Sequence, residues 1–173
     1  MKKLLSLLLV AVMIFSLAAC NSSKPEKALD DMLKALKAGD LDKLSELNGD
    51  KEADELSDED KALFKAIYGK MEYKVGKSEI DGEKAKVALE LKVVDLASVM
   101  EKFVNEAMKH MLESDWDYEA YIKELVNDKD AKTKSFDVTV PMEKKDGKWI
   151  VDEDGDLAEF ISALTGGIGV DEH

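Results

Sequence analysis

Residues 71–94 read MEYKVGKSEIDGEKAKVALELKVV, and this stretch decides the fold. Apolar and polar residues alternate on both sides of Ile80-Asp81-Gly82-Glu83, and alternation with a period of two indicates half-buried strands. Asp-Gly is a two-residue turn that hairpins favour. Gly76 predicts a bend or bulge in the first strand. The sequence therefore predicts an antiparallel hairpin whose apolar positions are Met71, Tyr73, Val75, Ala85, Val87, Leu89, Leu91 and Val93.

A second hairpin is predicted near the end of the chain. Apolar residues alternate from Phe136 to Met142, Asp146-Gly147 supplies the turn, and residues 149–151 return. Residues 83–94 and 133–144 are both long compared with the ~5–6 residues of a typical strand. Pro141 lacks an N–H donor, which predicts an edge or a bulge at that position.

Helical signals surround the two hairpins. Ser23-Lys24-Pro25-Glu26 predicts a capping box, and Gly39 predicts the end of the first helix. Further helices are predicted to begin at the capping residues Asp40, Ser57 (with Asp60), Asp95, Asp117 and Asp156. Residues 50–55 are predicted to be an acidic loop, and residues 117–126 an extra helix between the hairpins. The helix after Asp95 is predicted to bury one broad stripe formed by Leu96, Val99, Met100, Phe103, Val104, Ala107, Met108 and Met111.

This order of elements predicts an α+β fold. A curved antiparallel sheet of about four strands, in two Asp-Gly hairpins, would pack against helices and leave a concave face. We expect one domain over residues 25–167, followed by a frayed tail at 168–173.

The N-terminus predicts a lipoprotein signal peptide over residues 1–19. Lys2 and Lys3 precede an uncharged, mostly apolar stretch that is shorter than the ~20 residues of a spanning helix. The sequence Leu17-Ala18-Ala19-Cys20 resembles the bacterial lipobox, which implies cleavage between Ala19 and Cys20 and a diacylglyceryl group on Cys20. The alternatives are a leader that merely ends near a cysteine and a retained membrane anchor. Residues 20–24 would then be the lipidated cysteine and a short tether on the extracytoplasmic face of the cell membrane.

Composition excludes several classes of function. The chain has 38 acidic and 25 basic residues and a formal net charge of −13, whereas nucleic-acid binders carry a basic footprint. Cys20 is the single cysteine, so its lipidation would leave no disulfide, thiol nucleophile or thiolate metal site. No phosphate-binding loop or clustered metal ligands are present, so no cofactor and no metal are expected.

Three motifs carry a family resemblance: LKAGDLD at 36–42, FDVTV at 136–140 and KDGKWIV at 145–151. They resemble Gram-positive bacterial lipoproteins of uncharacterised function with a nuclear-transport-factor-2-like, cystatin-like cone domain. The resemblance implies helices packed on a strongly curved sheet that encloses a pocket. These are packing and turn motifs, and the fold hosts isomerases, dehydratases and binding domains alike, so it assigns no chemistry.

His110, Asp115 and Asp117 are the candidate catalytic residues. The resemblance implies a pocket Asp or an Asp–His pair as general base, and His110 can titrate near neutral pH. Histidine at a helix end also simply satisfies carbonyl groups and the helix dipole, which is the reading we favour. The acidic run 152–156 does not fit the EF-hand template, because isoleucine occupies its first and last ligand positions.

The aromatic residues Trp116, Tyr118, Tyr121 and Tyr73 are the candidate binding residues, with Trp116 first. We expect a non-enzymatic domain that is held to the membrane through Cys20 and binds a small apolar ligand or an envelope protein. Two alternatives stay open. One is an isomerase- or dehydratase-like enzyme, and the other is a structural protein of envelope assembly.

Overall fold

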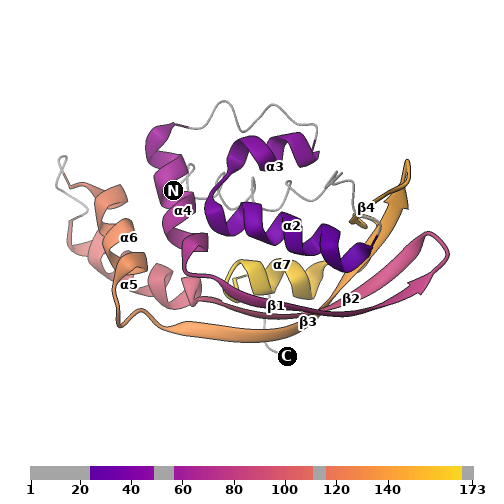
Figure 1. Ribbon diagram of the computed structural model, residues 1–173. Coiled ribbons are helices and arrows are strands. Elements are labelled where there is room, and N and C mark those ends of the chain that lie inside the picture. Colours follow the sequence, from indigo (N-terminus) through magenta and orange to yellow (C-terminus); the bar gives the residue numbers. More distant parts are fainter. Residues whose placement is uncertain (1–23, 49–56, 111–115, 169–173) are drawn as a thin grey trace.

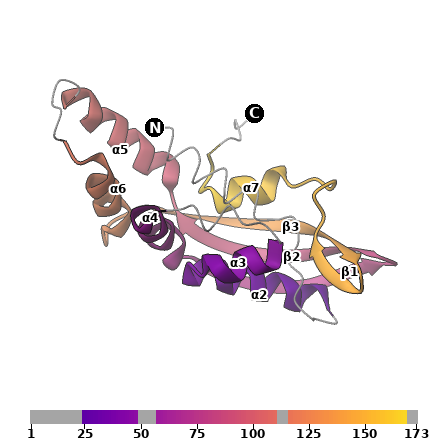
Figure 2. The ribbon, with the colours of Figure 1, turned by 90° about the horizontal axis from the view of Figure 1, so that it is seen from above.

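The computed structural model describes residues 24–48, 57–110 and 116–168. Helices α2, α3 and α7 lie on one side of a bent sheet, and α5 and α6 lie at one end of it (Figure 1). In the view from above, α2 and α7 lie apart, with the strands visible between them (Figure 2). The elements are α2 (Pro25–Ala38), α3 (Leu41–Asn48), α4 (Asp58–Gly69), β1 (Glu72–Asp81), β2 (Lys84–Val94), α5 (Leu96–Lys109), α6 (Tyr118–Asn127), β3 (Thr133–Lys145), β4 (Lys148–Val151) and α7 (Ala158–Leu164).

The predicted α+β class and the order of elements are confirmed. The four strands form one open antiparallel sheet in the order β1-β2-β3-β4, so each strand pairs with its neighbour in sequence. The predicted leader 1–19, Cys20, the loop 50–55 and the tail residues 169–173 lie outside the described residues.

The hydrophobic core lies between one face of the sheet and the helices. Alternate residues of β2 are buried, and the residues between them face solvent or are only partly covered. Leu29 and Leu33 of α2 and Phe160 of α7 are completely buried on this inner face. The inward residues of β2 are Ala85, Val87, Leu89, Leu91 and Val93. The period of two therefore gives the sheet one apolar face and one polar face.

Most predicted helix starts are confirmed by hydrogen bonds. Ser57 and Asp60 form a capping box, and the carboxylates of Asp95 and Asp117 accept from backbone N–H groups three residues later. The capping box predicted at residues 23–26 is wrong, because Lys24 is the N-cap of α2 and its side chain makes no capping hydrogen bond. A proline at the first helical position needs no donor, which suits this uncapped start.

The start predicted at Asp156 needs a smaller correction. The N-cap of α7 is Leu157, although the Asp156 carboxylate still accepts from the Ala158 N–H at 3.3 Å. A side-chain bond two residues on forms an Asx-type turn rather than a helix cap, so α7 begins later than the sequence indicates.

Both hairpins have two-residue turns. Asp81 pairs with Lys84, so the first turn is Gly82-Glu83, one residue later than predicted, and Gly82 has a φ of 60°. Glycine with positive φ at the first turn position is the type II′ pattern. Asp146 and Gly147 both have positive φ, at 52° and 78°, which is the type I′ pattern.

The bulge predicted at Gly76 is confirmed. The register of β1 on β2 shifts between Val75 and Ser78, so residues 76 and 77 both lie opposite Ala88. A Cβ at Gly76 would lie 3.0 Å from the Ala88 Cβ, and glycine is therefore the residue that fits.

The stripe predicted on α5 is wrong in its second half. Leu96, Val99 and Phe103 are buried, whereas Val104 and Met108 are 49% and 64% exposed. The second half of α5 extends past the end of the sheet, where α6 packs beside it (Figure 2). Apolar spacing predicts a face, but the neighbouring element decides whether that face is covered. Met111 lies outside the described residues.

Candidate functional site

Part of the edge of β3 is open. Strand β4 pairs only with Met142–Lys145, although β3 begins at Thr133. On the side away from β2, residues 133–140 have no strand partner within the described part of the chain. Sequence reasoning missed this edge, because strand lengths of 13 and four residues become meaningful only when the two are paired.

Pro141 marks where the cover ends. Its carbonyl accepts from the Asp152 N–H at 2.9 Å, just beyond β4. The N–H and C=O of one strand residue point to the same side, so the Pro141 nitrogen faces β4 and removes no bond to β2. Pro141 was predicted to lie at an edge or a bulge. It lies on the β3 edge, at the boundary between the part that β4 covers and the part that is open.

The alternating direction of backbone groups along β3 identifies which of them are open. The Lys144 N–H donates to the Glu83 carbonyl, so the backbone N–H and C=O groups of the even-numbered residues of β3 point towards β2. Ser135, Asp137 and Thr139 therefore direct their N–H and C=O groups to the open side. No backbone bond to these three residues on that side occurs among the residues that the structure describes.

Helix α7 forms the second wall of a groove beside this edge. The groove has a volume of about 430 Å³. Its β3 wall includes half-buried Phe136 and buried Val138, and its α7 wall includes Glu159 and Ser162. An apolar strip thus lies directly beside unpaired backbone donors and acceptors. The remaining described lining residues are Lys134, Ser135, Asp137 and Gly167.

The charge along the groove is mainly negative. The Lys134 ammonium lies 3.7 Å from the Asp95 carboxylate. Burial opposes ionisation of Asp95, but hydrogen bonds from Ser98 and the charge of Lys134 lower the pKa of its carboxyl group. The carboxylates of Asp137 and Glu159 make no ion pair with any residue in the described ranges.

The polar face of the sheet carries rows of charged residues across the strands, and one of these rows ends at Asp137. In one row Lys74 pairs with Glu90, and Glu90 lies opposite Asp137. The Lys74 ammonium lies 2.5 Å from the Glu90 carboxylate, so the outermost charge of the row is negative. A hollow of about 310 Å³ also crosses this face over β1, β2 and β3.

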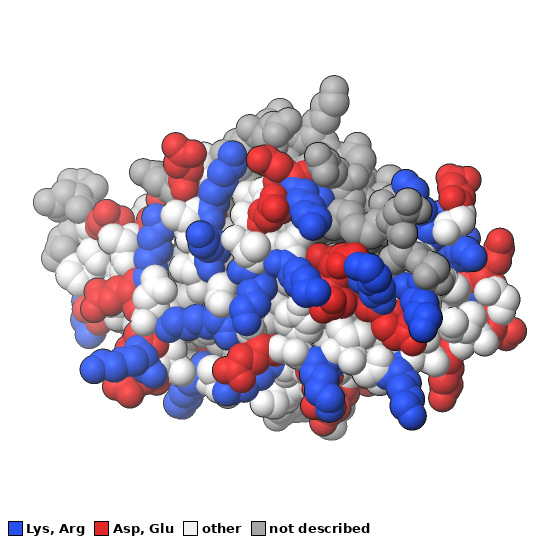
Figure 3. All heavy atoms as spheres, viewed as in Figure 1, with Lys and Arg blue, Asp and Glu red and all other residues white. Residues whose placement is uncertain are grey.

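On the face seen in Figure 3, lysines and acidic residues are interspersed, and neither sign forms a continuous area. The charge excess of the chain is therefore not concentrated on that face. This distribution makes the local rows at the sheet edge more informative than the net charge.

Several residues predicted from the sequence meet at the junction of α5 and α6. The Trp116 ring stacks on His110 at 5.0 Å between centroids and on Phe103 at 5.8 Å, and Tyr121 lies at 5.8 Å in a tilted arrangement. Trp116 is half-buried, and Phe103 joins the cluster to the core. Of the predicted binding residues, Trp116 and Tyr121 are brought together here.

Glu106 is a described carboxylate that contacts His110. The His110 Nε2 lies 3.4 Å from the Glu106 carboxylate, one helical turn earlier. Asp117 is exposed and its carboxylate caps α6, Tyr118 is exposed at the start of that helix, and Asp115 lies outside the described residues. Sequence reasoning missed Glu106, although the four-residue spacing on one helix was a signal for it.

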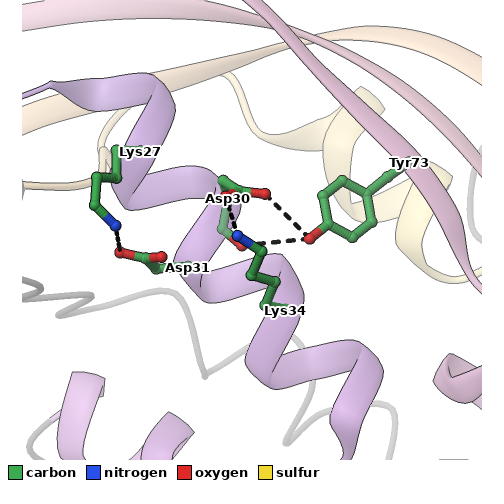
Figure 4. A network of polar contacts seen from close by, with 5 residues as sticks. All are labelled: Lys27, Asp30, Asp31, Lys34 and Tyr73. Carbon is green, nitrogen blue, oxygen red and sulfur yellow. Dashed lines mark hydrogen bonds and ion pairs between the residues drawn. The ribbon is translucent and has the colours of Figure 1, made fainter.

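Tyr73 belongs to a different cluster. Its hydroxyl donates to the Asp30 carboxylate of α2 at 3.2 Å, and Lys34 pairs with the same carboxylate at 2.5 Å (Figure 4). Lys27 and Asp31 form a neighbouring pair at 2.8 Å. Burial, together with the Asp30 charge, raises the pKa of Tyr73 to about 12. Tyr73 therefore ties β1 to α2 and does not line the Trp116 cluster.

No group of three or more histidine, cysteine, aspartate or glutamate side chains suited to a metal ion occurs in residues 24–48, 57–110 and 116–168. In the acidic run 152–156, the Asp152 carboxylate lies 2.8 Å from the Lys84 ammonium. Within those same ranges, no helix combines the length and apolar character needed to cross a bilayer.

No protein-family model and no curated protein matches the chain. Among solved structures, the Bacillus subtilis lipoprotein candidate ycdA is similar, with 20% identity and a TM-score of 0.44. The match covers 80% of this chain and 46% of that protein, so the chain spans less than half the length of ycdA. At this similarity neither fold nor function is transferred, and the function has to be argued from the residues of the chain itself.

Proposed function

We propose that this chain is a lipid-anchored extracytoplasmic domain that binds a protein partner and performs no catalysis. The anchor rests on Leu17-Ala18-Ala19-Cys20, whose pattern resembles a lipobox. A bent four-stranded sheet with helices on one side supports the resemblance to nuclear-transport-factor-2-like cone domains.

The observation that carries the binding role is the groove between the β3 edge and α7. It combines unpaired backbone groups at Ser135, Asp137 and Thr139 with the apolar surface of Phe136 and Val138. An open edge of this kind offers hydrogen bonds along a line, which suits an extended polypeptide better than a compact small molecule.

The polar candidates for catalysis have structural roles that account for their positions. Asp117 caps α6, and His110 ends α5 while it contacts Glu106 and Trp116. An isomerase- or dehydratase-like enzyme would have to use Glu106 with His110, because Glu106 is the described carboxylate beside this ring. That alternative predicts loss of an activity in Glu106→Gln, whereas the binding proposal predicts unchanged binding in both Glu106→Gln and His110→Ala.

The anchor is tested in cells of the source bacterium. Cys20→Ala should shift the protein from the membrane fraction to the medium or should accumulate the uncleaved precursor, and globomycin should accumulate the precursor of the wild-type chain. Membrane retention and normal cleavage of Cys20→Ala would contradict the anchor. Ala18→Gly is the control, since a small residue is retained there.

The binding role is tested on the full chain purified from its own envelope. Native mass spectrometry should show a retained protein partner, and the His110→Ala variant should retain the same partner. A chain that carries neither a partner nor a ligand would contradict the proposed function. A retained small molecule in place of a protein would keep a binding role but would contradict the protein partner.

A further inference from the structure

We infer that the open edge of β3 binds a basic, extended segment of a partner protein as a fifth strand of the sheet. The inference deepens the proposed binding function and rests on it. It concerns residues 133–140, which lie outside the aromatic cluster of Trp116 and outside the Tyr73 network.

Backbone geometry supplies the first argument. Ser135, Asp137 and Thr139 follow one another at a spacing of two residues, so their open groups form one straight row. The register of β3 on β2 is unbroken from Thr133 to Glu143, without a bulge that would twist the edge away. A strand added there can therefore bond to all three residues in register.

Side-chain charge selects the occupant. Residues opposite each other on neighbouring strands point to the same face, so the row Lys74, Glu90 and Asp137 would continue into the added strand. Lys74 pairs with Glu90, and Asp137 then presents the last, negative charge of the row. A lysine or arginine of the added strand opposite Asp137 would pair with the negative charge at the end of this row and would offset the repulsion between Asp137 and Glu90.

The neighbouring positions of the added strand point to the other face. They would lie beside Phe136 and Val138, in the groove whose outer wall carries Glu159. Apolar residues suit these positions, and the Glu159 carboxylate adds to the attraction for a basic segment. The complementary ligand is therefore an extended peptide in which basic and apolar residues alternate.

A second copy of this chain is disfavoured as the occupant. The chain carries a formal net charge of −13, so two copies repel each other. In a two-fold antiparallel pairing of β3 with β3 centred on residue 137, Asp137 would also face Asp137, and like charges directly opposite destabilise a strand pair.

The test measures the affinity of the full chain for an octapeptide of alternating lysine and valine, by isothermal titration calorimetry at low salt. We expect Asp137→Lys with Glu159→Lys to weaken binding about tenfold, and Glu79→Lys with Glu83→Lys, the same charge change on exposed residues of the β1–β2 hairpin, to leave it nearly unchanged. An octapeptide of alternating glutamate and valine should bind far more weakly. Equal losses in the two lysine variants would overturn the inference.

Backbone pairing is tested separately. Ser135→Pro removes the open N–H and should weaken binding about threefold to tenfold, whereas Ser135→Ala retains that N–H and should bind like the wild-type chain. If the proline variant does not fold, a lysine–valine peptide methylated on alternate backbone nitrogens tests the same row of bonds from the side of the ligand. Wild-type affinity for both methylated registers would overturn strand addition.

The remaining outcomes distinguish this inference from the proposed function. Sedimentation equilibrium that shows a dimer which dissociates on Asp137→Lys would assign the edge to a second copy and would overturn the inference. A native partner that does not compete with the peptide would also overturn it and would leave the binding function intact. Competition by the native partner would support both.

Discussion

The two edges of the sheet differ in how they are protected. Strand β1 forms one edge, and the bulge at residues 76 and 77 interrupts its pairing surface. Tyr73 and Ser78 of the same strand make hydrogen bonds to α2. The open part of β3 has neither a bulge nor a proline over residues 133–140, and α7 lies beside it without pairing with it.

Exposed strand edges invite pairing with other chains, and proteins usually blunt them. In this chain a bulge at residues 76 and 77 interrupts the β1 edge, whereas residues 133–140 of the β3 edge contain neither a bulge nor a proline. Pro141 and β4 protect the end of β3 and stop where the groove begins. The contrast supports our inference that a partner strand adds to the sheet at residues 133–140.

The largest expected effect separates the two sides of β3. Val138→Pro removes an N–H that faces β2 and should lower the free energy of unfolding by about 3 kcal/mol or more. Ser135→Pro removes an N–H that faces the open side and should lower it by less than about 1 kcal/mol. Urea unfolding followed by circular dichroism measures both. Equal losses of unfolding free energy in the two variants would contradict the assignment of the Val138 N–H to the β2 side and of the Ser135 N–H to the open side.

The covered part of the β3 edge should respond to acid. Lys145 lowers the pKa of the Glu143 carboxyl group, burial opposes this, and Lys84 at 3.2 Å adds to the lowering. The stability from this group is present above the ordinary pKa of 4.5 and is lost as pH falls through the lowered value.

Glu143→Gln should therefore cost about 2 kcal/mol at neutral pH, with a smaller loss of stability on acidification than the wild-type chain shows. Unfolding curves between neutral pH and pH about 3 give this difference. Glu90→Gln, which breaks the exposed pair with Lys74, is the control and should leave the stability nearly unchanged. A pH response in the Glu143 variant that matches the wild-type response would refute the role of this carboxylate.

At the β1 edge, Tyr73→Phe should cost about 1 kcal/mol, because the hydroxyl loses its bond to Asp30. The pKa of Tyr73 is raised to about 12, so its contribution is complete below the ordinary value of 10.0 and is lost as pH rises towards 12. The difference in melting temperature between the two chains should narrow over that range. Tyr118→Phe, at an exposed position, is the control. A difference in melting temperature that stays constant as pH rises would contradict the coupling between ionisation of Tyr73 and stability.

The smallest expected change tests the bulge itself. Deletion of Lys77 leaves Gly76 alone opposite Ala88 and restores a regular β1 edge, while residues on both sides keep their faces. The deletion should create weak binding of the lysine–valine peptide that persists in the presence of Asp137→Lys. Affinity measured on the double variant, against Asp137→Lys alone, gives the result. Failure to gain binding would mean that the bulge is not what protects this edge.

The parts of the fold that depend on local signals were predictable from the sequence. Ser57, Asp95 and Asp117 begin their helices because a side-chain oxygen satisfies nearby N–H groups, and this requires only neighbouring residues. Alternation from Ala85 to Val93 predicted one buried face of β2 for the same reason. The element order followed from these two kinds of signal.

The features that depend on distant neighbours were not predictable. Val104 and Met108 have the spacing of a buried stripe, but no described element covers them beyond the end of the sheet. The lengths of β3 and β4 are close to the predicted 133–144 and 149–151, but no local signal shows that no other described element pairs with residues 133–140. Tyr73 was selected as a pocket residue, and its hydrogen bond to Asp30 required the placement of α2 over β1.

Amide hydrogen exchange of the full chain, resolved by residue, tests the central claim most directly. In the free chain we predict fast exchange at Ser135, Asp137 and Thr139 and slow exchange at Phe136, Val138 and Val140. Addition of the lysine–valine octapeptide should slow the first three amides and leave the last three unchanged. Slow exchange at all six amides in the free chain, or fast exchange at the first three with the peptide bound, would contradict an open β3 edge that accepts a strand.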